Sequence, residues 1–251
     1  MGRIPVGLQM YTLRNEMAQD PIGTIRKVAE IGYEGIEALP WEGISVEDYR
    51  KLLDDLGLKT PGGHVPLEAL EADLNAVVDL YLALGATYVT VPYLAEERRK
   101  TGDDWRRLAE IMTEIGEKLA TQGLVLSYHN HSFEFQTFDG KYGFDIFFET
   151  ADPRYVKSQL DTYWVKHGGE DPAAYIRKLD HRTPLIHLKD MGEDGSFAEV
   201  GEGILDWEAI FDASEANGAV WYLVEQDTCK RPPIEAVAVS LDNLRAMGKL
   251  G

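Results

Sequence analysis

Short apolar runs alternate with longer amphipathic stretches along the whole chain, and this alternation limits the possible folds more than any other feature. Strands separated by helices pair in parallel. Eight such units in 251 residues match one closed (β/α)8 barrel, a fold of typically about 250 residues. We therefore predict a single (β/α)8 TIM barrel over residues 1–251. The expected strands are Val6–Met10, Tyr33–Leu39, Leu58–Gly62, Thr87–Val91, Leu124–His129, Tyr155–Asp161, Leu185–Lys189 and Val220–Gln226.

Capping signals delimit the helices between these strands. Asp20-Pro21 and Asp171-Pro172 each place Asp at the N-cap and Pro at the first helical position. Ser45 opens another helix, which we expect to end at Gly57. The other expected helices cover residues 67–84, 103–121, 144–150, 206–217 and 233–247. An open dinucleotide-binding sheet is the alternative fold, but no Gly-x-Gly-x-x-Gly motif follows the first strand.

Composition restricts the possible partners. The formal net charge is −18 and no Lys/Arg-rich stripe stands out, so we expect no nucleic-acid partner, since binding to phosphates depends on Lys and Arg. The single Cys229 excludes an intramolecular disulfide framework and a cysteine-cluster metal site. No signal peptide is recognisable, and no apolar run approaches the ~20 residues that span a bilayer. We expect a cytoplasmic protein without a membrane partner; whether it forms a homo-oligomer stays open.

Four of the expected strands end in a residue that can bind a metal: His129, Asp161, His187 and Glu225. In a (β/α)8 barrel the carboxyl ends of the strands meet at one mouth, where the active sites lie. Two imidazoles and two carboxylates suit Mn²⁺, Zn²⁺, Fe²⁺ or Co²⁺ better than Ca²⁺, which prefers oxygen ligands. We predict a divalent metal site, with Mn²⁺ as the first candidate and Zn²⁺, Co²⁺, Fe²⁺ or Mg²⁺ as alternatives.

Further polar and aromatic residues stand near the same strand ends. His131 lies two residues after His129 and shares its face if the strand continues. Lys189 shares a face with His187, and can hold a substrate hydroxyl or form a rim salt bridge. The glycines of Val200-Gly201-Glu202-Gly203 would let this segment cover the site as a lid. The candidates for substrate binding are Glu37, His64, Asn130, Trp164 and Glu202.

Several of these segments also carry a likeness to a known family. The chain resembles the xylose isomerase-like TIM-barrel superfamily, the sugar phosphate isomerase/epimerase group that includes inosose dehydratases and AP endonucleases. The likeness covers essentially the whole chain. It is carried by Val6–Arg14, Gly35–Glu37, Leu160–Trp164, His187–Asp190 and Val200–Gly203.

The resemblance implies a metal held by Glu, Asp, His and Glu from the last four strands. Asp161, His187 and Glu225 match three of these positions, whereas His129 stands where the family usually has Glu. Trp164 likewise replaces a His that often follows the strand-six Asp. In the epimerases of the group the two glutamates exchange the substrate proton, so a Glu225 base with an imidazole partner is the alternative here. A nuclease is disfavoured by the charge and by having only six histidines.

The function expected from this pattern is a metal-dependent sugar or sugar phosphate isomerase/epimerase that acts through an enediolate. Glu225 would be the base, His131 (or His129) an alternative base, and Lys189 or His64 would stabilise the enediolate oxygen. No Gly-rich phosphate cradle is evident, which favours a free sugar or cyclitol as the substrate. The alternatives are a lyase/dehydratase acting on a keto-inositol or keto-sugar, and a non-catalytic sugar-binding barrel.

Overall fold

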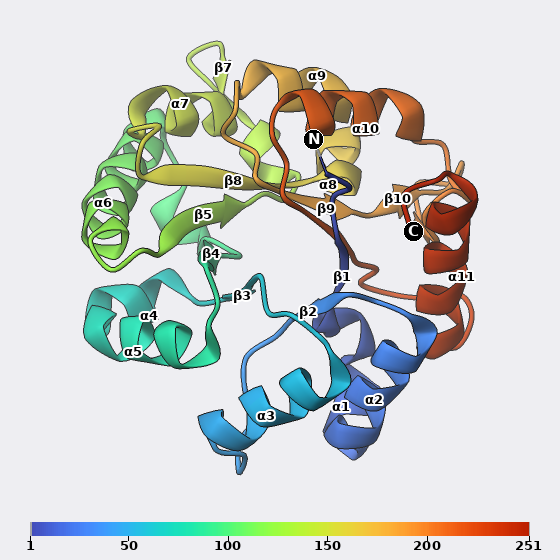
Figure 1. The fold of residues 1–251 in the computed structure, drawn as a ribbon. Coiled ribbons are helices and arrows are strands. Elements are labelled where there is room, and N and C mark those ends of the chain that lie inside the picture. Colours follow the sequence, from blue (N-terminus) through green and yellow to red (C-terminus); the bar gives the residue numbers. More distant parts are fainter. Residues whose placement is uncertain (1, 251) are drawn as a thin grey trace.

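The computed structural model describes residues 2–250 and contains one sheet of eight parallel strands in the order β2-β1-β12-β9-β8-β5-β4-β3. Figure 1 shows the helices in a ring around these strands. The structure therefore confirms the predicted (β/α)8 barrel. The strands are β1 Val6–Gln9, β2 Gly35–Glu37, β3 Gly62–His64, β4 Tyr88–Val91, β5 Val125–His129, β8 Val156–Asp161, β9 Leu185–Leu188 and β12 Trp221–Val224.

The helices lie between the strands, mostly as the sequence predicts. Ser45 accepts a hydrogen bond from Asp48 N at 3.0 Å at the start of α3, and Asp20 caps α2 through Gly23 N at 2.9 Å. The helices are α1 Arg14–Gln19, α2 Pro21–Ile31, α3 Val46–Leu56, α4 Leu67–Ala72, α5 Leu74–Leu84, α6 Gly102–Ala120, α7 Gly143–Thr150, α8 Thr162–His167, α9 Pro172–Lys178, α10 Trp207–Ala216 and α11 Pro233–Ala246.

Two of the expected elements are divided in the structure, and the helices α1 and α8 were not expected. The helix expected over residues 67–84 is two helices, because Asp73 leaves the helical conformation and caps α5 through Ala76 N at 3.0 Å. The third strand, expected at Leu58–Gly62, is interrupted. Lys59 forms an isolated parallel bridge with Gly35 of β2, and pairing with β4 begins only at Gly62. Pro61 has no N–H to donate, which explains the interruption.

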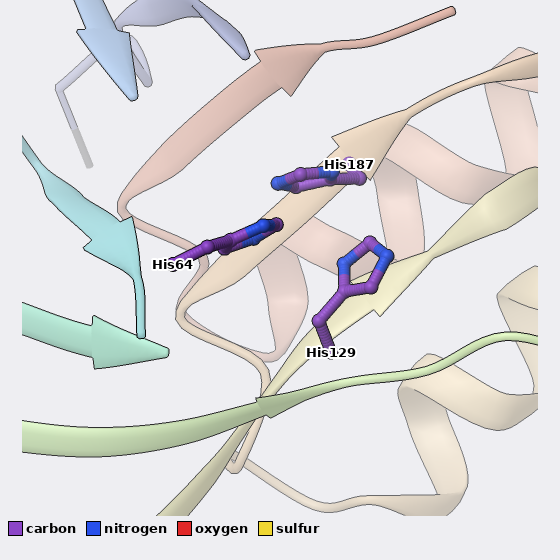
Figure 2. Close-up of side chains that lie close together, drawn as sticks. All are labelled: His64, His129 and His187. Atoms are coloured by element: carbon purple, nitrogen blue, oxygen red, sulfur yellow. The ribbon is translucent and has the colours of Figure 1, made fainter. Parts of the chain in front are cut away.

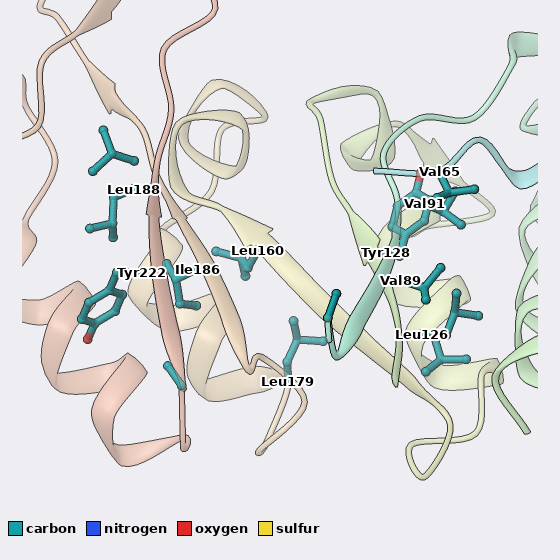
Figure 3. Close-up of a cluster of buried hydrophobic side chains, with 14 of the residues drawn as sticks. Val65, Val89, Val91, Leu126, Tyr128, Leu160, Leu179, Ile186, Leu188 and Tyr222 are labelled. Carbon is teal, nitrogen blue, oxygen red and sulfur yellow. The ribbon is translucent and has the colours of Figure 1, made fainter. Parts of the chain in front are cut away.

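The apolar core lies between the strands and the surrounding helices, and the inside of the barrel near the mouth is polar. Leu126, Leu160 and Ile186 are fully buried on the outward faces of their strands (Figure 3). The residues that alternate with them point inward because strand side chains switch faces at every residue. Gln159 and His187, both inward-facing, are also 0% exposed. A buried polar interior must be hydrogen-bonded, and its contacts define the site described next.

No helix among residues 2–250 is long and apolar enough to cross a membrane.

Short hairpins lie in the loops that follow the strands at the mouth of the barrel. The two hairpins are β6 Thr137–Phe138 with β7 Lys141–Tyr142, and β10 Asp190–Met191 with β11 Phe197–Ala198.

Candidate active site

The four residues at the strand ends lie together. His129, Asp161, His187 and Glu225 each offer a ligand atom within 4.8 Å of the others, and all four are buried. They come from β5, β8, β9 and the residue after β12. Parallel pairing aligns the strand ends, since Asp161 stands opposite His187 in the register of β8 and β9. The structure thus brings the predicted metal-ligand set to one place.

Three imidazoles gather at this mouth (Figure 2). His64 stacks on His187 with ring centroids 5.7 Å apart, and His129 lies 4.7 Å from His187 in an edge-to-face arrangement. Burial together with the neighbouring His187 holds the pKa of His129 well below its usual value. His129 is therefore a neutral imidazole, the form that binds metals.

His187 lies between two carboxylates. Its Nε2 is 2.8 Å from Glu37 Oε2, and its Nδ1 is 2.9 Å from Glu225 Oε2. Burial opposes protonation, but the two carboxylates raise the pKa of His187 to about 10. The ring is thus an imidazolium that donates to both neighbours. A metal ion on Nδ1 would have to replace that proton, whereas the bond to Glu37 would orient the ring.

Lys189 places a buried ammonium among three carboxylates. Its Nζ is 2.9 Å from Glu225 Oε2, 3.2 Å from Asp161 Oδ2 and 2.8 Å from Asp227 Oδ1. Burial opposes its charge, but these carboxylates raise the pKa of Lys189 above its usual value. In turn, Lys189 and His187 hold the pKa of Glu225 well below its usual value despite burial. Glu225 is therefore ionised.

The chemistry of the cluster fits a divalent cation. Asp161 Oδ2 is buried and has no hydrogen-bond partner among the residues that the structure describes, although the Lys189 ammonium is near. Burial raises the pKa of Asp161 to about 6 because Lys189 compensates its charge only in part. Buried charges need partners or a metal. The four residues can hold a metal ion, and two imidazoles with two carboxylates suit a transition metal.

A pocket of about 380 Å³ opens above this cluster. Its volume is within the 300–1,000 Å³ usual for small-molecule sites. Tyr11 and Tyr93 flank it with half of their surface exposed. Its lining residues are Tyr11, His64, Pro92, Tyr93, His129, His131, Lys189, Glu225 and Asp227.

The other predicted site residues take different places. His131 lines the pocket, with its ring stacked on Phe133 at 5.5 Å. Burial and Lys189 lower its pKa to about 4, so His131 is neutral. Trp164 packs against His131 at 5.2 Å without being among the lining residues. Asn130 Oδ1 accepts from Asp161 N at 2.9 Å and so holds the end of β8 in place.

Glu37 and Glu202 lie outside the pocket lining. Glu37 is fully buried beneath the histidines, whereas Glu202 forms an ion pair with Arg231 at 2.7 Å. The segment Val200–Gly203 is held by Asp190, whose carboxylate accepts from Gly201 N at 2.9 Å and Gly203 N at 3.1 Å.

The sequence prediction missed several site residues. Gln159 contacts His129, Gln9 contacts Glu37, Asp227 contacts Lys189, and Tyr11 and Tyr93 line the pocket. A signal for three of them was present. Gln159 and Asp227 each stand two residues from a predicted ligand, and Gln9 is the polar residue next to the end of the first expected strand, Val6–Met10. The two-residue spacing that puts His187 and Lys189 on one face of their strand also puts Gln159 on the face of Asp161, and Asp227 on the face of Glu225 if that strand continues.

Comparisons with known proteins identify the family of the chain. Residues 25–247 match the family described as xylose isomerase-like TIM barrel. The chain is 29% identical over 166 residues to an inosose dehydratase of Clostridium tetani, over 57% of this chain and 55% of that protein. It is 25% identical over 205 residues to the enzyme of that name from Clostridium botulinum, covering 68% of each. The match thus spans only about half to two thirds of these relatives.

Solved structures show the same fold. A sugar phosphate isomerase/epimerase from Parabacteroides distasonis superposes with a TM-score of 0.88 at 26% identity, covering 100% of this chain and 96% of that one. An L-ribulose 3-epimerase superposes with a TM-score of 0.70 at 19% identity, covering 99% and 97%, and this likeness shows the fold alone. From the family match over most of its length, the chain belongs to the xylose isomerase-like TIM barrel family.

Proposed function

We propose that the protein is a divalent-metal-dependent enzyme that forms an enediolate from a free keto-sugar or keto-cyclitol. The observation that carries the proposal is the position of Glu225, which lines a pocket of about 380 Å³ beside Lys189 and belongs to the candidate metal ligands. His129, Asp161, His187 and Glu225 would hold the metal, with Mn²⁺ as the first candidate. When bound, such an ion polarises the carbonyl group and acidifies the adjacent C–H proton.

In this proposal Glu225 takes the proton from the carbon next to the carbonyl group. Lys189 Nζ lies 2.9 Å from Glu225 Oε2 and lines the same pocket. As charge develops on the substrate oxygen, Lys189 can donate to that oxygen instead, which stabilises the enediolate. Losing the Lys189 contact would also make Glu225 a stronger base. Lys189 therefore couples charge on the substrate to the basicity of Glu225.

The pocket favours an unphosphorylated substrate. Lys189 is the only lysine or arginine among the lining residues that the structure describes, and three carboxylates within 3.2 Å already balance it. A phosphate group in this pocket would be repelled by Glu225 and Asp227, because the only cation of the described lining is already paired with them. The two half-exposed tyrosines suit the apolar face of a sugar or cyclitol ring.

Two reactions can follow the shared first step. In an isomerase or epimerase, the proton returns at another position or face. In a dehydratase, the C–O bond to the β-hydroxyl group breaks as a C=C bond forms, and the hydroxyl leaves as water with the proton that Glu225 has taken. One observation favours the second reaction. The carboxylates of the pocket lining, Glu225 and Asp227, both follow β12, whereas the lining residues at the end of β5, His129 and His131, are imidazoles and not the second carboxylate that a two-glutamate proton exchange uses. The inosose dehydratase relatives point the same way.

The test is a panel of ketoses, aldoses and keto-inositols with Mn²⁺ in deuterated water, followed by NMR. We expect either deuterium at the carbon next to the carbonyl group or loss of water from a keto-inositol. Glu225→Gln should lower the rate by at least about 10²-fold, as expected for loss of a general base. Glu215→Gln, on α10, is the control and should react normally. Binding of a substrate without turnover would show a sugar-binding barrel instead.

Metal content is measured separately, on protein purified without chelator. We expect His187→Ala and Glu225→Ala to lose the bound metal. Unchanged metal content in both variants would contradict the metal site without deciding the reaction.

A further inference from the structure

A buried glutamine connects the candidate metal ligands to the interior of the barrel. Gln159, on the inward face of β8, is 0% exposed. Its Nε2 donates to Glu37 Oε1 at 2.7 Å. Its Oε1 lies 2.7 Å from His64 Nε2 and 3.1 Å from His129 Nδ1. One amide thus contacts a carboxylate and two of the three clustered imidazoles.

Glu37 fixes the orientation of this amide. Two further donors surround its carboxylate, Gln9 Nε2 at 2.8 Å and His187 Nε2 at 2.8 Å. Gln9 is itself oriented by the backbone, because its Oε1 accepts from Tyr11 N at 3.1 Å. Its NH₂ group therefore faces the carboxylate, and a carboxylate surrounded by N–H donors accepts hydrogen bonds. The group of Gln159 that faces Glu37 must therefore be its NH₂. Its carbonyl oxygen must then face the two histidines.

This orientation determines which ring nitrogens carry protons. A carbonyl oxygen cannot donate, so both nitrogens that face it must be N–H groups. His129 therefore carries a proton on Nδ1, and its Nε2, which faces Asp161 Oδ2 at 3.9 Å, is the nitrogen left to bind a metal ion. His64 is likewise an Nε2–H donor. Gln9 supports this assignment, because its donor nitrogen lies 3.5 Å from His64 Nδ1.

We propose that Gln159 is a positioning residue that holds His129 in the Nδ1–H tautomer and so presents Nε2 to a metal ion. The inference rests on the metal site of the proposed function. Metal-binding histidines usually donate their other ring N–H to an oxygen that fixes the tautomer, and losing that partner typically costs 10–100-fold in metal affinity. Glu37 does the same for His187, since its carboxylate accepts from Nε2 of that ring.

The direct test is the tautomer in the metal-free protein, read from ¹⁵N-histidine NMR spectra of its six imidazoles. We expect the His129 ring, assigned with a His129→Gln variant, to show a protonated Nδ1 and an unprotonated Nε2. The opposite tautomer in the wild-type protein would overturn the proposal. This spectrum needs neither activity nor a substitution at position 159, so it stays decisive if Gln159→Met fails to fold.

Gln159→Met keeps the length of the side chain but removes both hydrogen-bonding groups. We expect the His129 Nδ1–H preference to be lost and the Kd for Mn²⁺, measured by chelator competition, to rise 10–100-fold. The first control is Gln9→Met, which removes another amide from Glu37 but none from His129. It should leave the His129 tautomer unchanged.

Ser158→Ala is a control on the opposite face of the same strand, where the buried Oγ has no partner among residues 2–250. It should keep both the tautomer and the Kd. A folded Gln159→Met protein with the wild-type tautomer and Kd would refute the positioning role. If the wild-type protein binds no divalent metal, the proposed metal site fails, yet the spectrum still tests Gln159.

Discussion

At the residue scale, Lys189 is the cation that compensates the charge of the buried carboxylates in the site. Its ammonium is 1% exposed and lies within 3.2 Å of three carboxylates. Removing one partner from a buried ion pair typically costs 3–5 kcal/mol, since the other charge stays buried. We expect Lys189→Met to lower the free energy of unfolding by about that amount, as measured by urea denaturation without metal.

Divalent metal should restore part of that stability, because a cation among the same carboxylates compensates their charge and a bound ligand stabilises the native state. Lys141→Met is the matched control. It removes an exposed ion pair to Glu149, 2.6 Å long, and such pairs contribute about 0–1 kcal/mol. A Lys189→Met protein that is as stable as Lys141→Met would show that the carboxylates do not depend on this ammonium.

Glu134 makes the stability of the folded protein depend on pH. Burial raises its pKa to about 8, while Oε1 contacts the Tyr128 hydroxyl and Oε2 accepts from His131 N, both at 2.8 Å. The unfolded chain releases this proton near pH 4.5, so the native state binds more protons between that pH and 8. Its contribution to stability therefore falls as the pH rises through this range.

Replacing Glu134 with Gln should remove this dependence. We expect Glu134→Gln to gain stability relative to wild type between pH 5 and 8, on the order of 2 kcal/mol or more, from thermal unfolding. Glu170→Gln is the control, because Glu170 also accepts from a tyrosine hydroxyl, that of Tyr142 at 2.8 Å, but is only half-buried. Parallel pH curves for wild type and Glu134→Gln would contradict the shifted pKa.

The residues at the strand ends could be predicted from sequence, whereas the contacts that arrange them could not. His129 and Asp161 end apolar runs, so their place at the mouth follows from strand geometry alone. Gln159 stands inside such a run. Its spacing of two residues from Asp161 places it on the same face of the strand, but the sequence does not show which side chains it meets there. Only the closed sheet brings Glu37, 122 positions away, within 2.7 Å of Gln159.

At the element scale, the hairpin and loop after β9 depend on one carboxylate. Asp190 is fully buried and accepts from Gly201 N, Gly203 N, Leu205 N and Trp207 Nε1 at 2.8–3.3 Å. The sequence predicted a flexible lid here because of its glycines. It could not show that Asp190, next to Lys189, anchors the same glycines through their backbone.

Asp190→Ala should therefore loosen this segment. Each unsatisfied buried donor costs about 1–3 kcal/mol, so we expect several kcal/mol of destabilisation and faster hydrogen exchange across residues 192–206. Asp194→Ala is the control. Asp194 is an exposed carboxylate of the same hairpin, bonded to Ser196 N at 3.0 Å, and its loss should leave exchange outside the hairpin unchanged. Normal protection of Gly201 and Gly203 in Asp190→Ala would disprove the anchor.

At the scale of the whole molecule, the barrel closes through a narrow seam between the second and third strands. Only the Gly35–Lys59 bridge appears here within residues 2–250, with Ile36 N donating to Lys59 O at 2.9 Å. The alternation of strands and helices predicted eight units but not this seam, because Pro61 and two glycines interrupt the apolar pattern of the third strand. Glu37 and His64 lie at the ends of the two strands that meet there.

Gly35→Ala tests whether the seam and the site are linked. An added Cβ would lie 2.7 Å from Lys59 O and 2.9 Å from the Trp221 ring, too close for either, so β2 must move away from the third strand. Overpacking of this kind typically costs 1–3 kcal/mol. Since Glu37 is two residues further along β2, we expect weaker Mn²⁺ binding together with a lower Tm.

Gly102→Ala is the control, because its Cβ would meet nothing closer than 3.5 Å and Ala favours the start of α6. A Gly35→Ala protein with wild-type Tm and Mn²⁺ affinity would show that the seam tolerates the methyl group. Lower stability with unchanged affinity would show that Glu37 keeps its place independently of barrel closure.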